Sequence, residues 1–159
     1  MYGNLSVKKL ILGFHYHVPL IIKDGSPTTA SFLGVFLDSL ASKVEELVLL
    51  TYTPAPSEEI MMDYVLKAQN IRVVDLGVHE SLPIRMMKTP WVISKIRHEV
   101  ERLDVLLIRC PTPLMPSLSN LKKVKKSYFV VGDYQKSARD LNLPWIRKTA
   151  IRLWAFFYN

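Results

Sequence analysis

The sequence has few cysteines and no long hydrophobic segment, and both absences limit where the protein can work. Cys110 is the only cysteine among 159 residues, so an internal disulfide is excluded and a reducing compartment is favoured. No apolar run approaches the roughly 18 to 20 residues of a membrane helix. Residues 1–9 lack the charged and then apolar layout of a signal peptide. We therefore expect a cytoplasmic protein.

The motifs of several common enzyme classes are absent as well. The sequence contains neither the G-x-G-x-x-G turn of dinucleotide-binding folds nor the G-x-x-x-x-G-K-[ST] loop of P-loop enzymes. No paired cysteines or histidines have zinc-finger spacing, and no nucleophile elbow of the hydrolase type occurs. These absences argue against a dinucleotide-binding enzyme, a P-loop NTPase and a complete small enzyme such as a flavodoxin-like hydrolase.

Positive charge exceeds negative charge. Lysine and arginine number 21 against 14 for aspartate and glutamate, which is a formal charge of +7. Two clusters hold much of the excess: Lys122, Lys123, Lys125 and Lys126, and then Arg147, Lys148 and Arg152. Such clusters favour nucleic acid, phosphate groups or an acidic membrane surface as partners, and each cluster can equally be a solvated face.

Short apolar segments alternate with amphipathic segments along the chain. The apolar segments, each expected to be a buried strand, are 10–14, 47–52, 71–76, 105–108 and 128–131. The amphipathic segments, each expected to be a helix, begin near Thr28 or Thr29, at Ser57 (to about Ala68), at Thr89, at Leu118 (to Lys126) and at Pro144. Three prolines predict an irregular loop over 109–116. The alternation predicts a single Rossmann-like α/β domain, with a mostly parallel sheet and helices on both faces.

Ligands of open parallel sheets bind beyond the carboxyl ends of the strands, so the polar residues there are the first candidates for a site. His15 and His17 follow the first strand and share a face if that segment is extended. They could be a metal pair, although no third ligand is obvious, a base with its helper, or one packed and one solvated side chain. Arg109 directly follows four apolar residues, where it can be structural or can contact a phosphate or carboxylate.

The segment 24–29, Asp-Gly-Ser-Pro-Thr-Thr, places a glycine and several hydroxyl groups before an expected helix. Backbone N–H groups at a helix N-terminus can hold an anion or the hydroxyl groups of a sugar. Ordinary helix capping explains the same residues, and the two roles are compatible.

The order of these pieces resembles the N-terminal domain of GT-B glycosyltransferases, family 4 in particular. The resemblance is carried by five stretches: Phe14–Pro19, Asp24–Thr28, Leu33–Ala41, Asp104–Pro111 and Tyr128–Tyr134. It implies an acceptor-binding domain over 1–142, followed by a helix over 143–159 that leads toward a missing second domain. That second domain binds the nucleotide-sugar donor in such enzymes, so no cofactor and no metal are expected on this one.

The resemblance also implies roles for individual residues. His15 and His17 are the candidates for a catalytic base, which inverting relatives place after the first strand and the retaining family 4 does not need. The implied acceptor-binding residues are His17, Asp24, Gly25, Ser26, Thr28, Arg109 and Asp133. Arg109 and Cys110 stand where many relatives carry a histidine. The implied partners are a sugar or lipid-linked acceptor and a donor domain of the same or another chain, with peripheral contact to the inner face of the membrane and no nucleic acid.

The alternative hypothesis is a basic, non-enzymatic α/β module that binds RNA or an anionic membrane surface. The lysine cluster at 122–126 motivates it, as does the expected terminal helix. That helix places Ile146, Ala150, Leu153 and Phe157 on one side, with Trp154 at the edge, and the basic residues on the other. We expect the apolar side to pack against protein, with docking to a membrane as the rival.

Overall fold

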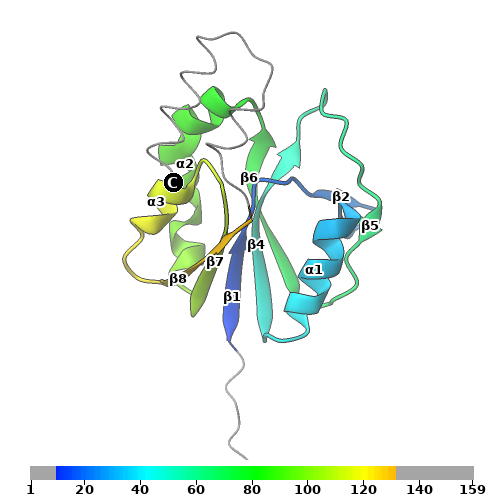
Figure 1. Cartoon of the computed structure of the whole chain (residues 1–159), viewed down its shortest axis with the longest axis horizontal. Coiled ribbons are helices and arrows are strands. Elements are labelled where there is room, and N and C mark those ends of the chain that lie inside the picture. The colour runs from blue at the N-terminus through cyan, green and yellow to red at the C-terminus, as the bar shows by residue number, and fades with distance from the viewer. Residues whose placement is uncertain (1–9, 132–159) are drawn as a thin grey trace, which may run out of the picture.

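The computed structural model describes residues 10–131, which form one layered α/β unit (Figure 1). A five-stranded sheet lies at its centre, with the strand order β6-β4-β1-β7-β8 and every neighbouring pair parallel. The strands are β1 (Ile11–His15), β4 (Glu46–Pro54), β6 (Ile71–His79), β7 (Val105–Cys110) and β8 (Lys125–Val130). Ranked by their place in the chain, these strands follow the order of doubly wound folds, and the order reverses between β1 and β7.

Helices cover both faces of the sheet, as the alternating pattern predicts. Figure 1 shows α1 (Ser31–Ala41) on one side, and α2 (Leu82–Val100) with α3 (Met115–Ser119) on the other. Each side has its own buried core. Leu33 and Leu37 of α1 pack with Leu12 and Phe14 of β1, whereas α2 and α3 pack on the face that carries Leu106 and Ile108. The predicted fold class, a single Rossmann-like α/β domain, is confirmed.

The segment after β1 forms a hairpin rather than a loop that leads into a helix. β2 (Ile21–Lys23) pairs antiparallel with β3 (Ser26–Thr29), and β3 pairs with β5 (Tyr64–Val65) in a second, three-stranded sheet. Asp24 and Gly25 form the turn with φ of 50° and 77°, the positive values that a two-residue hairpin turn requires. The helix predicted near Thr28 or Thr29 begins at Ser31, two residues later, and neither threonine caps it, because both lie in β3.

Helix α1 begins at Ser31, and its first turn is capped by a distant residue. Its N-cap residue, Ala30, has no side chain that could accept a hydrogen bond. The backbone N–H of Ser31 donates instead to the Asp63 carboxylate at 2.8 Å. A carboxylate at this position also interacts favourably with the positive end of the helix dipole.

The helix predicted over 57–68 is absent, because the backbone of this segment is hydrogen-bonded elsewhere. Tyr64 and Val65 pair with β3. The Asp38 carboxylate on α1 accepts the N–H groups of Lys67 and Ala68 at 3.0 Å each and the Tyr64 hydroxyl at 2.8 Å. These contacts hold the segment extended beside α1.

Helix α2 begins seven residues before the predicted cap at Thr89. The Thr89 hydroxyl donates to the Arg85 carbonyl at 3.0 Å, one turn back along the same helix, and Pro90 lies inside the helix. The predicted start is therefore wrong, since Pro83 rather than Pro90 occupies the first turn. Farther along, Val92, Ile96 and Val100 are buried at helical spacing, as expected of an amphipathic helix.

The chain after β7 is more regular than its prolines suggest. β7 continues through Cys110 and α3 starts at Met115, so the irregular stretch is shorter than the predicted loop over 109–116. The basic helix predicted over 118–126 is wrong, because Lys125 and Lys126 already pair with Val105 and Leu106 of β7. The backbone groups of Lys125 and Lys126 are therefore hydrogen-bonded in the edge strand of the sheet and not in a helix.

Three expectations fall on residues outside 10–131: the terminal helix from Pro144, its basic cluster, and Asp133 as a ligand-binding residue. Within the described range, no helix is both long and apolar enough to span a membrane.

Candidate functional site

Several titratable side chains lie at or just beyond the carboxyl ends of β1, β4, β6 and β7. His15 is the last residue of β1 and His79 the last of β6, while Arg109 is the penultimate residue of β7. Arg85 approaches from the first turns of α2. This edge of the sheet is where open α/β folds bind their ligands.

His15 is fully buried, and both of its ring nitrogens are used. Nδ1 lies 2.9 Å from the Leu50 carbonyl and Nε2 lies 2.8 Å from the Thr112 hydroxyl. A carbonyl only accepts, so Nδ1 carries the hydrogen and the Thr112 hydroxyl donates to Nε2. Burial lowers the pKa of His15 to about 4 and keeps the ring neutral. The ring thus joins β1, β4 and the loop after β7, and it has no nitrogen left for a ligand.

His17 differs from His15 because Nδ1 is buried with no hydrogen-bond partner. Its ring packs on Tyr16, with 4.4 Å between the ring centres. Burial, followed by the positive charge of Arg85, lowers the pKa of His17 to about 4, and the Pro111 carbonyl partly opposes this. His17 is therefore a neutral imidazole at neutral pH.

Arg109 lies among aromatic rings on the α1 side of the sheet. Its guanidinium carbon is 4.4 Å from the centre of the Tyr16 ring, 5.7 Å from Phe129 and 5.9 Å from Phe36. Such cation–π contacts hold the guanidinium in place, although Nε is buried without a hydrogen-bond partner. Because Tyr16 touches both Arg109 and His17, the structure brings two of the predicted acceptor-binding residues together.

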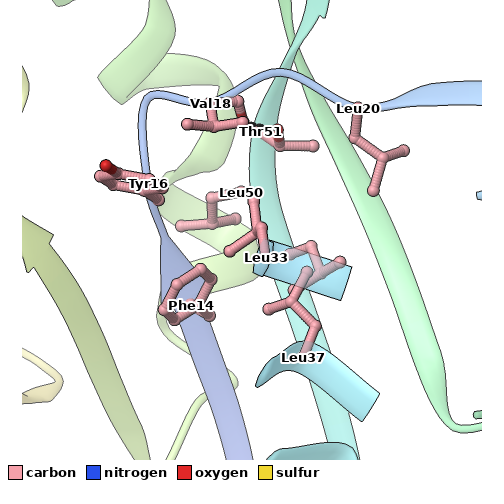
Figure 2. Close-up of a pocket in the computed structure, with 9 residues that line it drawn as sticks. Phe14, Tyr16, Val18, Leu20, Leu33, Leu37, Leu50 and Thr51 are labelled. Atoms are coloured by element: carbon pink, nitrogen blue, oxygen red, sulfur yellow. Dashed lines mark hydrogen bonds between the residues drawn. The ribbon is translucent and has the colours of Figure 1, made fainter. Parts of the chain in front are cut away.

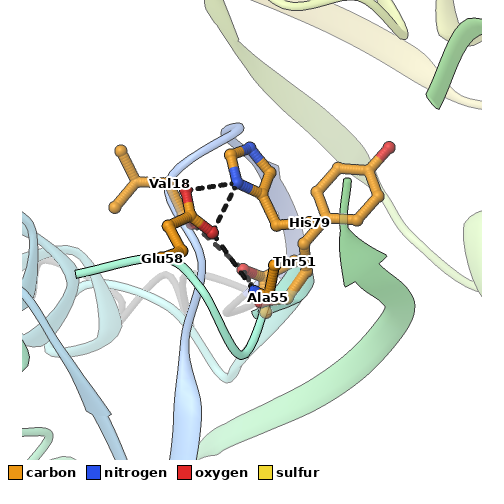
Figure 3. Close-up of polar contacts among 6 residues, drawn as sticks. Val18, Thr51, Ala55, Glu58 and His79 are labelled. Carbon is orange, nitrogen blue, oxygen red and sulfur yellow. Dashed lines mark hydrogen bonds and ion pairs between the residues drawn. The ribbon is translucent and has the colours of Figure 1, made fainter. Parts of the chain in front are cut away.

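Glu58 and His79 form an imidazole–carboxylate pair (Figure 3). His79 Nδ1 lies 2.7 Å from Oε1 and 2.9 Å from Oε2 of Glu58, and Oε2 also accepts the Ala55 N–H at 3.3 Å. The carboxylate therefore holds the imidazole hydrogen on Nδ1 and leaves Nε2 with a lone pair. Nε2 is buried and has no partner. This arrangement can accept a hydrogen bond or a proton from a ligand hydroxyl group.

Tyr52 connects the histidines. Its ring lies 6.5 Å from the His15 ring and 5.6 Å from the His79 ring, measured between centres, and the Arg85 guanidinium carbon lies 5.7 Å from it. Burial and then the charge of Arg85 lower the pKa of His79, while Glu58 raises it. A single guanidinium thus favours the neutral form of both His17 and His79.

Several cavities adjoin this region, among them two of very different size. Figure 2 shows the first, a pocket of about 10 Å³ lined by apolar side chains such as Phe14, Leu33 and Leu37, which has room for no more than one water. The second is a depression of about 560 Å³, open to solvent. Its polar lining consists of Ser57, Glu58, His79, Glu80, Ser81 and Arg85.

The other predicted binding residues lie in the β2–β3 hairpin. Asp24 and Gly25 are exposed in its turn, whereas Thr28 is buried and donates its hydroxyl to the Ser26 carbonyl at 3.3 Å. The N-terminus of α1 follows them directly at Ser31, but its first N–H group is bound by Asp63. The hairpin belongs to the small sheet beside α1, whereas the imidazole–carboxylate pair lies at the ends of β4 and β6.

The sequence did not reveal Glu58, Tyr52 and Arg85 as members of the site. Glu58 was expected in the first turn of a helix, and Arg85 lies before the expected helix start at Thr89. His79 was recognisable only as a residue at the end of a strand. Within the described part of the chain, no group of three or more histidine, cysteine or acidic side chains is placed to hold a metal ion.

No family model, no curated protein and no solved structure matches this chain. A function can therefore be argued only from the residues and geometry described above.

Proposed function

We propose that this chain is the acceptor-binding half of a glycosyltransferase that moves a sugar from a nucleotide-sugar donor to an acceptor hydroxyl group. A separate domain binds the donor, and this domain needs no cofactor of its own. The proposal rests on one observation above all. At the carboxyl edge of the sheet, two neutral imidazoles, His17 and His79, each keep one buried nitrogen without a partner.

The connection after β1 supports an acceptor role rather than a donor role. In nucleotide-binding folds of this order, a glycine-rich turn leads from the first strand into a helix whose N-terminus holds the phosphates. Here β1 is followed by the β2–β3 hairpin, and the N-terminal N–H of α1 at Ser31 is occupied by Asp63. The cradle that a diphosphate needs is therefore missing from this connection.

The unpaired imidazole nitrogens support a ligand that carries hydroxyl groups. A buried polar atom without a partner costs about 1–3 kcal/mol, which a ligand that pairs with it restores. The polar depression next to His79 offers further partners through Ser57, Glu80 and Ser81. Sugar acceptors present several hydroxyl groups on a small surface and match such a site.

The proposal predicts selective binding. Titration calorimetry of the 159-residue chain should show binding of neutral mono- or disaccharides and no binding of nucleotide-sugars such as UDP-glucose. The purified chain should also transfer no sugar, because half a cleft neither orients the donor nor stabilises its leaving group. Micromolar affinity for a nucleotide-sugar, or measurable transfer by this chain alone, would overturn the proposal.

A second candidate function is a basic module that binds RNA or an anionic membrane, and the exposed lysines at the start of β8 favour it. Lys122, Lys123 and Lys125 are exposed, and Lys123 forms an ion pair with Glu101 at 3.0 Å. Phosphate contacts give a steep dependence of affinity on salt. A filter-binding assay with a salt titration identifies this function if RNA binds and the slope is steep.

A further inference from the structure

The Glu58–His79 pair has an unmet requirement for a hydrogen-bond donor. Because Glu58 holds the imidazole hydrogen on Nδ1, the Nε2 atom of His79 can only accept. It is buried and has no partner in the described part of the chain. Buried polar atoms in folded proteins are nearly always paired, and exceptions are common at functional sites. A ligand for this atom must therefore bring a donor.

The surrounding charges restrict which donors fit. The guanidinium of Arg85 stabilises the neutral forms of His17 and His79 and thereby opposes any further positive charge beside them. Lys88 adds a second cation, which pairs with Glu80 at 2.5 Å. An ammonium group is disfavoured here, whereas a neutral hydroxyl group can donate without a charge penalty.

The size and lining of the depression favour a saccharide. Its volume of about 560 Å³ lies within the roughly 300–1,000 Å³ range of small-molecule sites. Six of its lining residues are polar: two serines, two glutamates, a histidine and an arginine. Such a wall can donate to and accept from several hydroxyl groups at once, while Ala55 and Ile84 add apolar surface.

We propose that this depression is the subsite for the acceptor saccharide, and that His79 Nε2 accepts a hydrogen bond from one of its hydroxyl groups. Glu58 acts as a positioning residue, because it fixes the tautomer and the orientation of the ring. This inference rests on the proposed glycosyltransferase function and moves the acceptor from the β2–β3 hairpin to the ends of β4 and β6.

The test follows the His79 ring by NMR while the 159-residue chain is titrated with a panel of neutral mono- and disaccharides. A binding saccharide should shift the His79 ring resonances in a saturable way. It should also lower the pKa of His79, since a hydrogen bond donated to Nε2 stabilises the neutral ring. A purely structural His79 would show neither response.

Variants sharpen the result. His79→Gln should weaken saccharide binding at least tenfold, while His98→Gln, the same change at an exposed position of α2, should leave the affinity unchanged. Glu58→Gln should lower the pKa of His79, because the carboxylate raises it, and should weaken binding severalfold. If His79→Gln fails to fold, the titration of the natural chain still decides the question.

The outcomes separate this inference from the function on which it rests. Saccharide binding that shifts Arg109 or hairpin resonances and leaves His79 unmoved overturns the subsite and leaves the glycosyltransferase proposal standing. If no saccharide of the panel binds and UDP-glucose does, both are overturned. Saturable shifts at His79 in the natural chain, together with at least tenfold weaker saccharide binding by His79→Gln, support both.

Discussion

At the scale of single residues, three histidines in one region have three different environments. His15 has a partner at each nitrogen, His79 has one at Nδ1 alone, and His17 has an unpartnered Nδ1. Burial is the largest cause of the lowered pKa in each. What distinguishes them is which backbone or side-chain group happens to face the ring, and this decides which imidazole is free to meet a ligand.

The buried histidines predict that acid destabilises the fold. The pKa of His15 is about 4 in the folded state and about 6.5 in the unfolded state. The unfolded chain therefore binds a proton first as the pH falls, and the stabilisation present above pH 6.5 is lost progressively down to about pH 4. Between pH 7 and pH 5 this loss amounts to about 2 kcal/mol for His15, and His17, with the same folded pKa, adds a similar loss.

Urea denaturation at several pH values measures the effect. Replacing His15 by Gln should reduce the change in unfolding free energy between pH 7 and pH 5 by about 2 kcal/mol, whatever its effect on stability at pH 7. Replacing the exposed His98 by Gln should leave that change as it is. A His15→Gln chain with the pH dependence of the natural protein would show that folding leaves the pKa of His15 unshifted.

At the scale of elements, the small sheet depends on a few polar side chains that hold distant segments together. Asp63 caps α1 from 32 residues away, and Asp38 on α1 binds the chain just after β5. The Tyr64 ring lies between them, directly over Gly34. A glycine in the middle of α1 is explained by this close approach of the ring rather than by helix formation, which glycine opposes.

Replacing Gly34 by Ala should destabilise the protein by about 1–3 kcal/mol. The added Cβ would lie 2.2 Å from Cδ1 of Tyr64, and the Tyr64 hydroxyl is held by Asp38 at 2.8 Å. The clash therefore outweighs the gain in helix propensity of up to about 1 kcal/mol. Thermal and urea unfolding of Gly34→Ala and the natural chain measure this loss of stability.

Val35→Ala serves as the matched control for this change, because Val35 is 57% exposed on the same helix and its replacement should change stability by less than about 0.5 kcal/mol. Equal stability of Gly34→Ala and the natural chain would mean that the Tyr64 ring moves aside at no cost.

At the scale of the whole molecule, the lysines at the start of β8 and the guanidinium of Arg109 lie toward opposite ends of one sheet. Lys125 starts β8 opposite Val105, the first residue of β7, whereas Arg109 lies near the carboxyl end of β7. A six-residue strand spans roughly 20 Å, more than twice the Debye length of about 8 Å at physiological salt. The lysines therefore contribute little to the electrostatic potential in the polar depression next to His79.

The combined change of Lys122, Lys123 and Lys125 to Glu should leave saccharide affinity within about twofold of the natural value, because screening separates the two ends. The same change should remove any salt-dependent binding of RNA or anionic vesicles. Calorimetry measures the saccharide affinity, and filter binding measures the salt-dependent binding of RNA. Loss of saccharide binding in the triple variant would place the ligand near the amino end of the sheet instead.

The sequence by itself determined the strands of the large sheet and the buried face of α2, because both depend on the periodicity of neighbouring residues. It also marked His17 and Arg109 as residues at strand ends. Tertiary structure alone decided the hairpin partner β5, the early start of α2 and the pairing of Glu58 with His79. The β3–β5 pairing and the Glu58–His79 contact join groups 21 or more residues apart in the chain, as does the hydrogen bond from Ser31 to Asp63. The pattern of neighbouring residues does not indicate which distant carboxylate will contact which backbone N–H or imidazole. The chemistry of the site is therefore decided only by the tertiary structure, which places the strands side by side.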